Sequence, residues 1–200
     1  MHSAKLPESF YLNPDVKEVA RNLVGKVLCT RLHGHPLTSG LIVETEAYSG
    51  RNDKACHANN GTRTERTEVM YHRGGIAYVY LCYGIHHLFN VVSNVEGQAD
   101  AVLIRAIKPL DGITTILQRR NAEELTPAVA AGPGRLTQAL GISTDNYGTN
   151  LTGDQIWIED RGSENNGKIE ATLRIGVDYA GEHARRPWRF SIKDHLWVSK

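Results

Sequence analysis

The chain has few of the residues from which disulfide frameworks and zinc sites are built. Its 200 residues include only three cysteines, Cys29, Cys56 and Cys82. Because they are odd in number, widely spaced and form no C-x-x-C pair, they argue against both kinds of site. No apolar run approaches membrane-spanning length, and the N-terminus has no apolar region typical of a signal peptide. We therefore expect a cytoplasmic protein that does not bind membranes.

Several motifs that mark a known chemistry are also missing. There is no G-x-S-x-G and no H-E-x-x-H, and residues 132–134 (GPG) lack the rest of a phosphate-binding loop. Histidines could combine with Glu44 or Glu46 in a metal site, and this alternative stays open. However, His86 and His87 are adjacent and would point to opposite faces of a strand. We therefore expect neither a metal ion nor another cofactor.

The composition is that of one globular domain. Hydrophobic residues make up 40% and charged residues 22%, with a net charge of +1, which argues against wholesale disorder. No linker divides the sequence, so we expect one domain over residues 1–200, with a loosely ordered lead-in over 1–12.

The expected elements are mostly strands. Periodicity and turn residues predict helices over 16–24, 112–121 and 131–141, and strands over 26–32, 39–48, 76–82, 88–95, 101–107, 155–159 and 171–177. The polar segment 49–75 is expected to be a long loop with short helical pieces. Strands that follow strands, with few helices between them, indicate an α+β fold on a mainly antiparallel sheet.

Two carboxylates and a phenol lie in the strand predicted over 39–48. Because strand side chains alternate between faces, Glu44, Glu46 and Tyr48 share one face, while the other face is mostly apolar and is expected to belong to the core. A carboxylate beside an aromatic ring on a rigid strand suits a pocket that binds a flat ring and performs acid–base chemistry on it. Periodicity alone favours a simpler interpretation, a sheet face turned to water.

Arg105 lies in a run that is otherwise apolar on both faces, so we expect it to be buried. Buried arginines are almost always paired, and Glu44 and Glu46 are the obvious partners. The pair could be purely structural, or Arg105 and a glutamate could hold a water molecule between them.

Three tyrosines mark the strand predicted over 76–82. Tyr78 and Tyr80 share a face, and Tyr83 precedes Gly84, which predicts a turn from which Tyr83 would project. Strand tyrosines usually pack, but a projecting aromatic ring can also stack on bases or wedge into a duplex.

Together these segments resemble the alkyladenine (3-methyladenine) DNA glycosylase family. The matching segments are 42–48 (IVETEAY), 55–57 (ACH), 78–84 (YVYLCYG), Asn90, 102–105 (VLIR), 131–136 (AGPGRL) and 174–181 (RIGVDYAG). They occur in the family's order, and the similarity spans residues 9 to 198. The resemblance implies a curved sheet with flanking helices and a protruding β-hairpin.

The resemblance also implies a role for individual residues in hydrolysis. Glu46 takes the position of the general base, and Arg105 takes the position that helps to hold the attacking water. The carbonyl of Val177 matches a third contact to this water.

Other residues match those that bind the base and the DNA. Tyr48, His57 and Tyr80 fall on the positions that sandwich a flipped base. Tyr83 matches the side chain that fills the gap in the duplex, and Asn90 matches the residue that obstructs the amino group of guanine.

The implied activity is that of a monofunctional DNA glycosylase that initiates base excision repair. Its partner would be double-stranded DNA with alkylated or deaminated purines, such as 3-methyladenine, 7-methylguanine, hypoxanthine and ethenoadenine. We expect it to act as a monomer, near the nucleoid in a bacterium or in the nucleus of a eukaryote. A metal-dependent hydrolase and a non-catalytic nucleic-acid-binding module are the alternatives.

Overall fold

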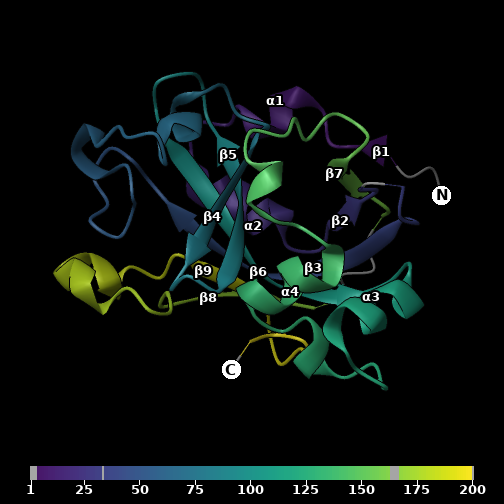
Figure 1. The fold of residues 1–200 in the computed structure, drawn as a ribbon. Coiled ribbons are helices and arrows are strands. Elements are labelled where there is room, and N and C mark those ends of the chain that lie inside the picture. The colour runs from purple at the N-terminus through teal and green to yellow at the C-terminus, as the bar shows by residue number, and fades with distance from the viewer. Residues whose placement is uncertain (1–3, 33, 163–166, 200) are drawn as a thin grey trace.

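One curled antiparallel sheet organises the molecule (Figure 1). The computed structural model describes residues 4–32, 34–162 and 167–199. Within these ranges the nine strands are β1 (Ala4–Lys5), β2 (Val27–Thr30), β3 (Thr38–Tyr48), β4 (Ala77–Cys82), β5 (His86–Ser93), β6 (Asp100–Pro109), β7 (Ile156–Asp160), β8 (Ile169–Thr172) and β9 (Arg189–Ile192). They pair in the order β1-β7-β2-β3-β6-β5-β4, with β9 between β3 and β8. The predicted α+β fold on an antiparallel sheet is confirmed.

The central strand β3 changes partner half-way along its length. β6 lies along one edge of β3, whereas the other edge is paired first with β2, up to Leu41, and then with β9 at residues 44–46. The register with β6 shifts on both sides of Glu44, as at a β-bulge. Bulges bend a strand and re-aim its side chains, so the irregularity lies where the acidic residues of β3 begin.

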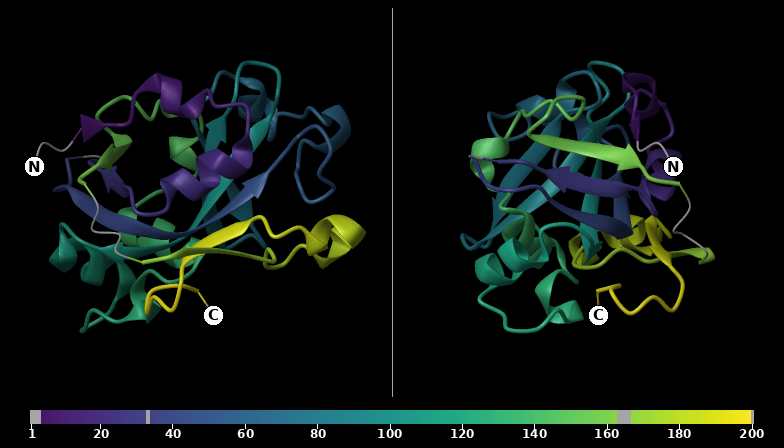
Figure 2. Two further views of the ribbon diagram at one scale, coloured as in Figure 1. Left: turned by 180° about the vertical axis from the view of Figure 1, so that it is seen from behind. Right: turned by 90° about the vertical axis from the view of Figure 1, so that its right-hand side faces the viewer.

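The helices cover both faces of the sheet (Figure 2). α2 (Val16–Leu23) begins at Asp15, whose side chain accepts a hydrogen bond from the amide of Lys17 at 2.9 Å. Its buried side packs on β3, where the Thr45 hydroxyl donates to the carbonyl of Ala20 at 2.8 Å. Thr45 therefore faces α2, and its neighbours Glu44 and Glu46 face the opposite side of the sheet.

On that opposite side lie α3 (Ile113–Arg120) and α4 (Pro133–Leu140), which pack on each other. α4 also packs on β5 and β6, and α3 on β3. The remaining helical elements in the described residues are one further α-helix and several 3-10 segments. They are α1 (Glu8–Tyr11) and the 3-10 turns η1 (Asn59–Gly61), η2 (Glu68–Tyr71), η3 (Pro127–Val129), η4 (Thr144–Asn146) and η5 (Asp178–Arg185). The long loop predicted over 49–75 is confirmed, and η1 and η2 are its helical pieces.

The two ends of the chain differ most from the prediction. The strand predicted over 171–177 is wrong beyond Thr172, where β8 ends and the chain turns through Gly176 at φ 74°. The prediction also misses β9, whose four residues of mixed polarity give no clear period. In the expected lead-in, residues 4–12 contain β1 and α1, and Tyr11 is fully buried. Residues 1–3 lie outside the described residues.

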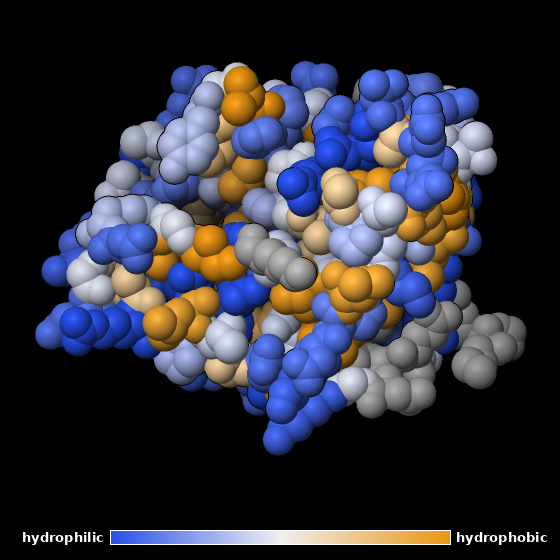
Figure 3. Space-filling model, turned by 90° about the horizontal axis from the view of Figure 1, so that it is seen from below, coloured by the Kyte–Doolittle hydropathy of each residue, from blue (hydrophilic) through white to orange (hydrophobic). Residues whose placement is uncertain are grey.

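The face seen from below is not continuously apolar (Figure 3). In the view from below, apolar and polar side chains alternate around a hollow (Figure 3). None of the helices in the described residues is long and apolar enough to cross a membrane.

Candidate active site

A cavity of about 440 Å³ lies on the side of the sheet opposite α2, between the β4–β5 hairpin, the start of α4 and the segment that leads into η5. It is lined by seven of the residues that the sequence singles out: Tyr48, His57, Tyr80, Tyr83, Asn90, Arg105 and Val177. Segments that are far apart in the sequence therefore meet at one site. Its volume is in the range of small-molecule pockets.

Glu46 is fully buried and lies directly behind the wall of this cavity. Its Oε2 accepts hydrogen bonds from the phenol of Tyr48 at 2.7 Å and from Nη1 of Arg105 at 3.3 Å. Its Oε1 accepts a hydrogen bond from the backbone amide of Ile175 at 2.8 Å. All three donors belong to residues that line the cavity, so the carboxylate is one residue away from the space that they enclose.

The phenol of Tyr48 is a donor to this carboxylate and not a competing anion. Burial and then the negative charge of Glu46 hold the pKa of Tyr48 well above its usual value. The phenol therefore keeps its proton throughout the physiological range.

Arg105 bridges the two glutamates of β3, as the sequence leads us to expect. Its Nε donates to Oε1 of Glu44 at 3.0 Å, while its Nη1 contacts Glu46. Burial disfavours the positive charge, but Glu46 and Glu44 more than offset this effect, so the pKa of Arg105 is raised. The guanidinium remains charged at the cavity wall.

Glu44 serves a different set of contacts from those of Glu46. Besides Arg105 it accepts a hydrogen bond from Nε of Arg189 at 2.6 Å, and from the amide and hydroxyl of Ser199 at 2.7 and 2.9 Å. Its four donors join β6, β9 and the C-terminal segment. Glu44 is therefore the centre of a buried structural network.

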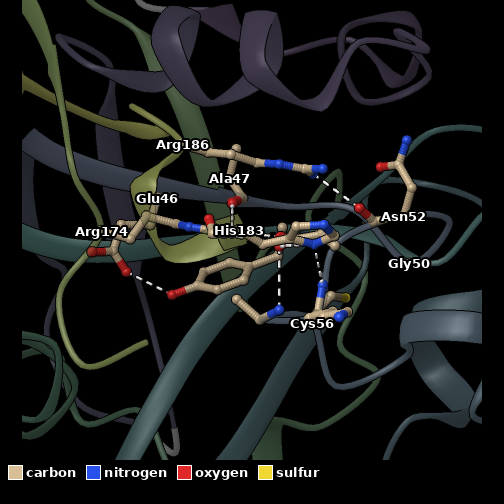
Figure 4. Close-up of polar contacts among 12 residues, drawn as sticks. Glu46, Ala47, Gly50, Asn52, Cys56, Arg174, His183 and Arg186 are labelled. Atoms are coloured by element: carbon tan, nitrogen blue, oxygen red, sulfur yellow. Dashed lines mark hydrogen bonds and ion pairs between the residues drawn. The ribbon is translucent and has the colours of Figure 1, made fainter. Parts of the chain in front are cut away.

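Arg174, which sequence reasoning did not single out, supports Tyr48 (Figure 4). Its guanidinium lies 4.8 Å from the centre of the Tyr48 ring and 5.2 Å from that of Trp188. It donates to Oδ1 of Asp53 and to the carbonyl of Ala47, each at 2.8 Å. The side chains of Arg174 and Asp53 have no exposed surface, so this ion pair holds its arrangement without competition from water.

The loop after β3 is also fixed to the segment around η5 (Figure 4). Nδ1 of His183 accepts a hydrogen bond from the amide of Lys54 at 2.9 Å, and Arg186 donates to the carbonyl of Asn52 at 2.9 Å. These bonds and the ion pair of Arg174 join residues 47–54, which include Tyr48, to residues 174–186.

An aromatic cluster forms another part of the cavity wall. The rings of His57 and Tyr80 meet edge to face with 4.8 Å between centres, and Tyr78 and Tyr80 are tilted by 30° at 5.3 Å. The hydroxyl of Tyr78 is 2.9 Å from Nδ1 of His57. Burial raises the pKa of Tyr78 to about 12, and burial followed by the charge of Arg66 lowers the pKa of His57 to about 4. His57 is therefore neutral at pH 7.

Tyr83 lies at the tip between β4 and β5, where both Tyr83 and Gly84 have positive φ angles of 51° and 73°. Its side chain is 92% exposed although it borders the cavity. None of the described residues covers this aromatic ring. At the other end of the hairpin, Asn90 is buried and donates to the carbonyl of Tyr78 at 3.1 Å.

Val177 is buried at the cavity wall, and its carbonyl already accepts a hydrogen bond from the amide of Ala180 at 2.9 Å. A carbonyl has a second lone pair, so the oxygen can accept one more hydrogen bond.

Two contributions to this site were not predicted from the sequence. The bond from Ile175 to Glu46 uses a backbone amide, and Arg174 lies in the segment that is wrongly predicted as a strand. Among the residues that the structure describes, no three histidine, cysteine, aspartate or glutamate side chains are grouped so that they could hold a metal ion.

Comparison with known proteins identifies the family of this chain. The family model of methylpurine-DNA glycosylase matches residues 9–196. The chain belongs to the methylpurine-DNA glycosylase family. The resemblance inferred from the sequence is thereby confirmed.

Curated relatives of this methylpurine-DNA glycosylase family member match over almost the full length. A protein of Chlamydia felis (strain Fe/C-56), named "Putative 3-methyladenine DNA glycosylase", is 48% identical over 188 residues, 94% of this chain and 95% of that one. A protein of Bacillus cereus (strain G9842) with the same name is 46% identical over 203 residues, 97% of this chain and 98% of that one.

Proposed function

We propose that this protein is a monofunctional DNA glycosylase that flips a damaged purine out of duplex DNA and hydrolyses the bond between base and deoxyribose, which initiates base excision repair. Family membership and the names of its relatives support this reading. One observation carries the mechanism. The buried carboxylate of Glu46 is held by Arg105 and Tyr48 at the wall of a cavity that has aromatic sides.

Glu46 is the proposed general base. In the reaction the bond from C1′ to the purine nitrogen breaks, and its electron pair leaves with the base. A water oxygen forms the new bond to C1′, and Glu46 takes the proton that the water loses. Its negative charge also stabilises the positive charge that develops on the sugar. Arg105 and the carbonyl of Val177 are the proposed contacts that orient the water.

Tyr48, His57 and Tyr80 are the proposed contacts of the flipped base. Flipping costs a few kcal/mol, least for a damaged or mispaired base, and stacking on aromatic rings recovers part of this cost. Alkylation at N3 or N7 makes a purine cationic, and a cationic ring binds the faces of electron-rich tyrosines better than a neutral one does.

The proposed substrates are 3-methyladenine, 7-methylguanine, hypoxanthine and ethenoadenine. Asn90 is the proposed obstacle to the exocyclic amino group of guanine, which favours purines without that group. Tyr83, exposed at the tip of the hairpin, is the side chain proposed to fill the gap in the duplex.

The absence of lysine from the cavity supports a monofunctional reaction. None of the residues that line the cavity in the described part of the chain is a lysine. Cleavage of the DNA strand by a lyase requires an amine that forms a Schiff base with the sugar. We therefore expect the product to be an intact abasic strand. We also propose that the protein acts as a monomer without a cofactor.

The decisive experiment measures release of free base from duplex oligonucleotides that carry one lesion, in the presence of a chelator. The wild type should release 3-methyladenine and hypoxanthine, and Glu46→Gln should be slower by about 10²–10⁴-fold, the usual contribution of general base catalysis. Glu96→Gln, at an exposed position outside the cavity, is the matched control.

The outcomes separate the alternatives. If Glu46→Gln binds lesion duplex like the wild type but releases base at a normal rate, Glu46 is not the base. Activity that the chelator abolishes and added metal restores would indicate a metal-dependent hydrolase. Binding of lesion duplex without any base release, by the wild type itself, would indicate a non-catalytic binding module.

A further inference from the structure

An exposed arginine outside the cavity contacts two of its aromatic residues. The guanidinium carbon of Arg66 lies 4.7 Å from the centre of the Tyr80 ring. Its Nη2 is 3.1 Å from Nε2 and 3.3 Å from Nδ1 of His57. Arg66 itself does not line the cavity, so it acts on the site through the aromatic side chains that it contacts.

These contacts define the state of His57. A guanidinium has only donors, so the nitrogen of His57 that faces Arg66 must have a free lone pair. Nη2 of Arg66 lies at similar distances from both ring nitrogens, and Nδ1 is also 2.9 Å from the hydroxyl of Tyr78. A doubly protonated ring would offer only donors to this guanidinium, so the contacts favour the neutral ring. His57 is therefore neutral and has no acidic proton to give to a purine.

A neutral lesion needs help that a cationic one does not. When a neutral purine such as hypoxanthine leaves C1′, it takes the electron pair of the broken bond and becomes negatively charged. The water that attacks C1′ gives its proton to Glu46 and not to the base, so the negative charge must be stabilised by another group. When 7-methylguanine leaves, its positive charge is neutralised by the same electron pair, and no negative charge develops.

We propose that Arg66 is a specificity-determining residue that favours neutral purines, because its permanent positive charge, transmitted through His57 and Tyr80, stabilises the base as it leaves. This inference rests on the proposed function. It assigns the stabilisation of the leaving base to the fixed charge of Arg66 and not to a proton donor. The same charge repels a cationic purine once it has been flipped, but this repulsion disappears as that base leaves. The rate in the bound complex is measured from the state in which the base is still stacked in the duplex, away from Arg66, because flipping has a net cost. Relative to that state Arg66 promotes the release of neutral purines, which leave with a negative charge, and affects cationic ones little, because they leave without a net charge.

The size of the effect follows from distance. A base stacked on the free face of Tyr80 would lie on the order of 8 Å from the guanidinium, where one unit charge at an intermediate dielectric constant changes a rate by about fivefold. The exposure of Arg66 and dissolved salt keep the effect from being larger.

The test compares duplexes that carry hypoxanthine or 7-methylguanine at the same position. Base release is measured in single turnovers with enzyme in saturating excess, so that weaker binding of DNA does not affect the rate. Arg66→Met should lower hypoxanthine release about fivefold and leave 7-methylguanine release within about twofold. Arg66→Lys, which keeps the charge, should restore most of the ratio.

Arg63→Met is the matched control. Arg63 is an exposed arginine of the same loop that lies over another tyrosine, Tyr71, at 4.9 Å and pairs with Glu68, away from the cavity. The ratio of hypoxanthine release to 7-methylguanine release in Arg63→Met should equal that of the wild type.

The possible failures are distinct. If the wild type releases neither base, the proposed function is wrong and this inference falls with it. If the wild type releases both bases and Arg66→Met slows them equally, only the inference is wrong, and Arg66 is a structural residue. Release of 7-methylguanine but not of hypoxanthine by the wild type would also overturn it, because Arg66 would then give no help to a neutral base.

Discussion

The phenol of Tyr48 donates a hydrogen bond of 2.7 Å to Oε2 of Glu46, two positions back along the same strand. The ring of Tyr48 borders the cavity, whereas the carboxylate of Glu46 lies behind it. The side chain of Tyr48 thus lines the cavity and also orients the carboxylate of Glu46. Because Arg105 and the amide of Ile175 complete the set of donors, the carboxylate is oriented before any substrate binds.

The first prediction concerns this hydrogen bond. Tyr48→Phe keeps the ring but removes the donor to Glu46. A hydrogen bond to a charged group contributes about 1.5 kcal/mol, so base release in single turnovers should slow about tenfold while lesion binding is retained. Tyr71→Phe is the control, because it removes a phenol bonded to the carbonyl of Thr62 at 3.0 Å outside the cavity. Equal rates in the two variants would show that the Tyr48 hydroxyl is dispensable.

Much of this site could be predicted because its residues conflict with the local pattern of the sequence. Glu44, Glu46 and Arg105 are charges inside strands that are otherwise apolar, and buried charges need partners. The pairing of Arg105 with both glutamates follows from this rule, and the structure bears it out. Periodicity alone favoured a solvated face for β3, and this interpretation is wrong because Glu44 and Glu46 have no exposed surface.

Other parts could not be predicted, for physical reasons. The division of roles between the two glutamates depends on the bulge at Glu44 and on β9, which brings Arg189 beside the strand. Pairing between distant strands leaves no local signal in a short segment of mixed polarity. Arg174 is equally hidden, because its partner Asp53 lies 121 positions away in a loop.

The second prediction separates Glu44 from Glu46. Glu44→Gln leaves Arg105 and Arg189 without their shared counter-charge in a buried network, which should cost about 3 kcal/mol in the free energy of unfolding. Urea denaturation measures this loss, and Glu96→Gln at an exposed position is the control. A Glu44→Gln variant as stable as this control would mean that the network contributes nothing to stability.

The third prediction concerns the buried ion pair behind Tyr48. Arg174→Met leaves the carboxylate of Asp53 buried without its partner, and should destabilise the fold by about 3–5 kcal/mol. Asp53→Asn should have a similar cost, for the same reason. In the double variant no uncompensated charge remains, so its loss in urea denaturation should be smaller than the sum of the two single losses. Additive losses would show that the two side chains are not coupled.

The fourth prediction concerns the exposed ring of Tyr83. Tyr83→Ala should weaken binding to lesion duplex about tenfold or more, because stacking of an aromatic ring on bases contributes about 1–3 kcal/mol. The rate of the chemical step at saturation should change less. Since Tyr83 is 92% exposed, the midpoint of urea denaturation should stay that of the wild type. Leu196→Ala, a position 72% exposed and away from the cavity, is the control. Unchanged lesion binding would exclude the proposed role of Tyr83.

The last prediction concerns the pH dependence of stability. His57 has a pKa of about 4 in the folded protein, against an ordinary value of 6.5, because it is buried and lies beside Arg66. Between these two values the unfolded chain binds a proton that the folded protein does not. The contribution of His57 to stability is therefore complete above pH 6.5, its ordinary pKa, and is lost as the pH falls toward about 4.

The wild type should consequently lose about 1–2 kcal/mol from this group between about pH 7.5 and about pH 5, after allowance for the partial exposure of the ring. His57→Gln lacks this titrating imidazole, so its free energy of unfolding should fall by about 1–2 kcal/mol less over the same pH interval. The other histidines contribute equally to both proteins. The measurement is urea denaturation of both proteins at the two pH values. If both lose the same stability, His57 takes up its proton as readily in the folded protein as in the unfolded chain, and the neutral state that Arg66 and burial impose on it does not exist.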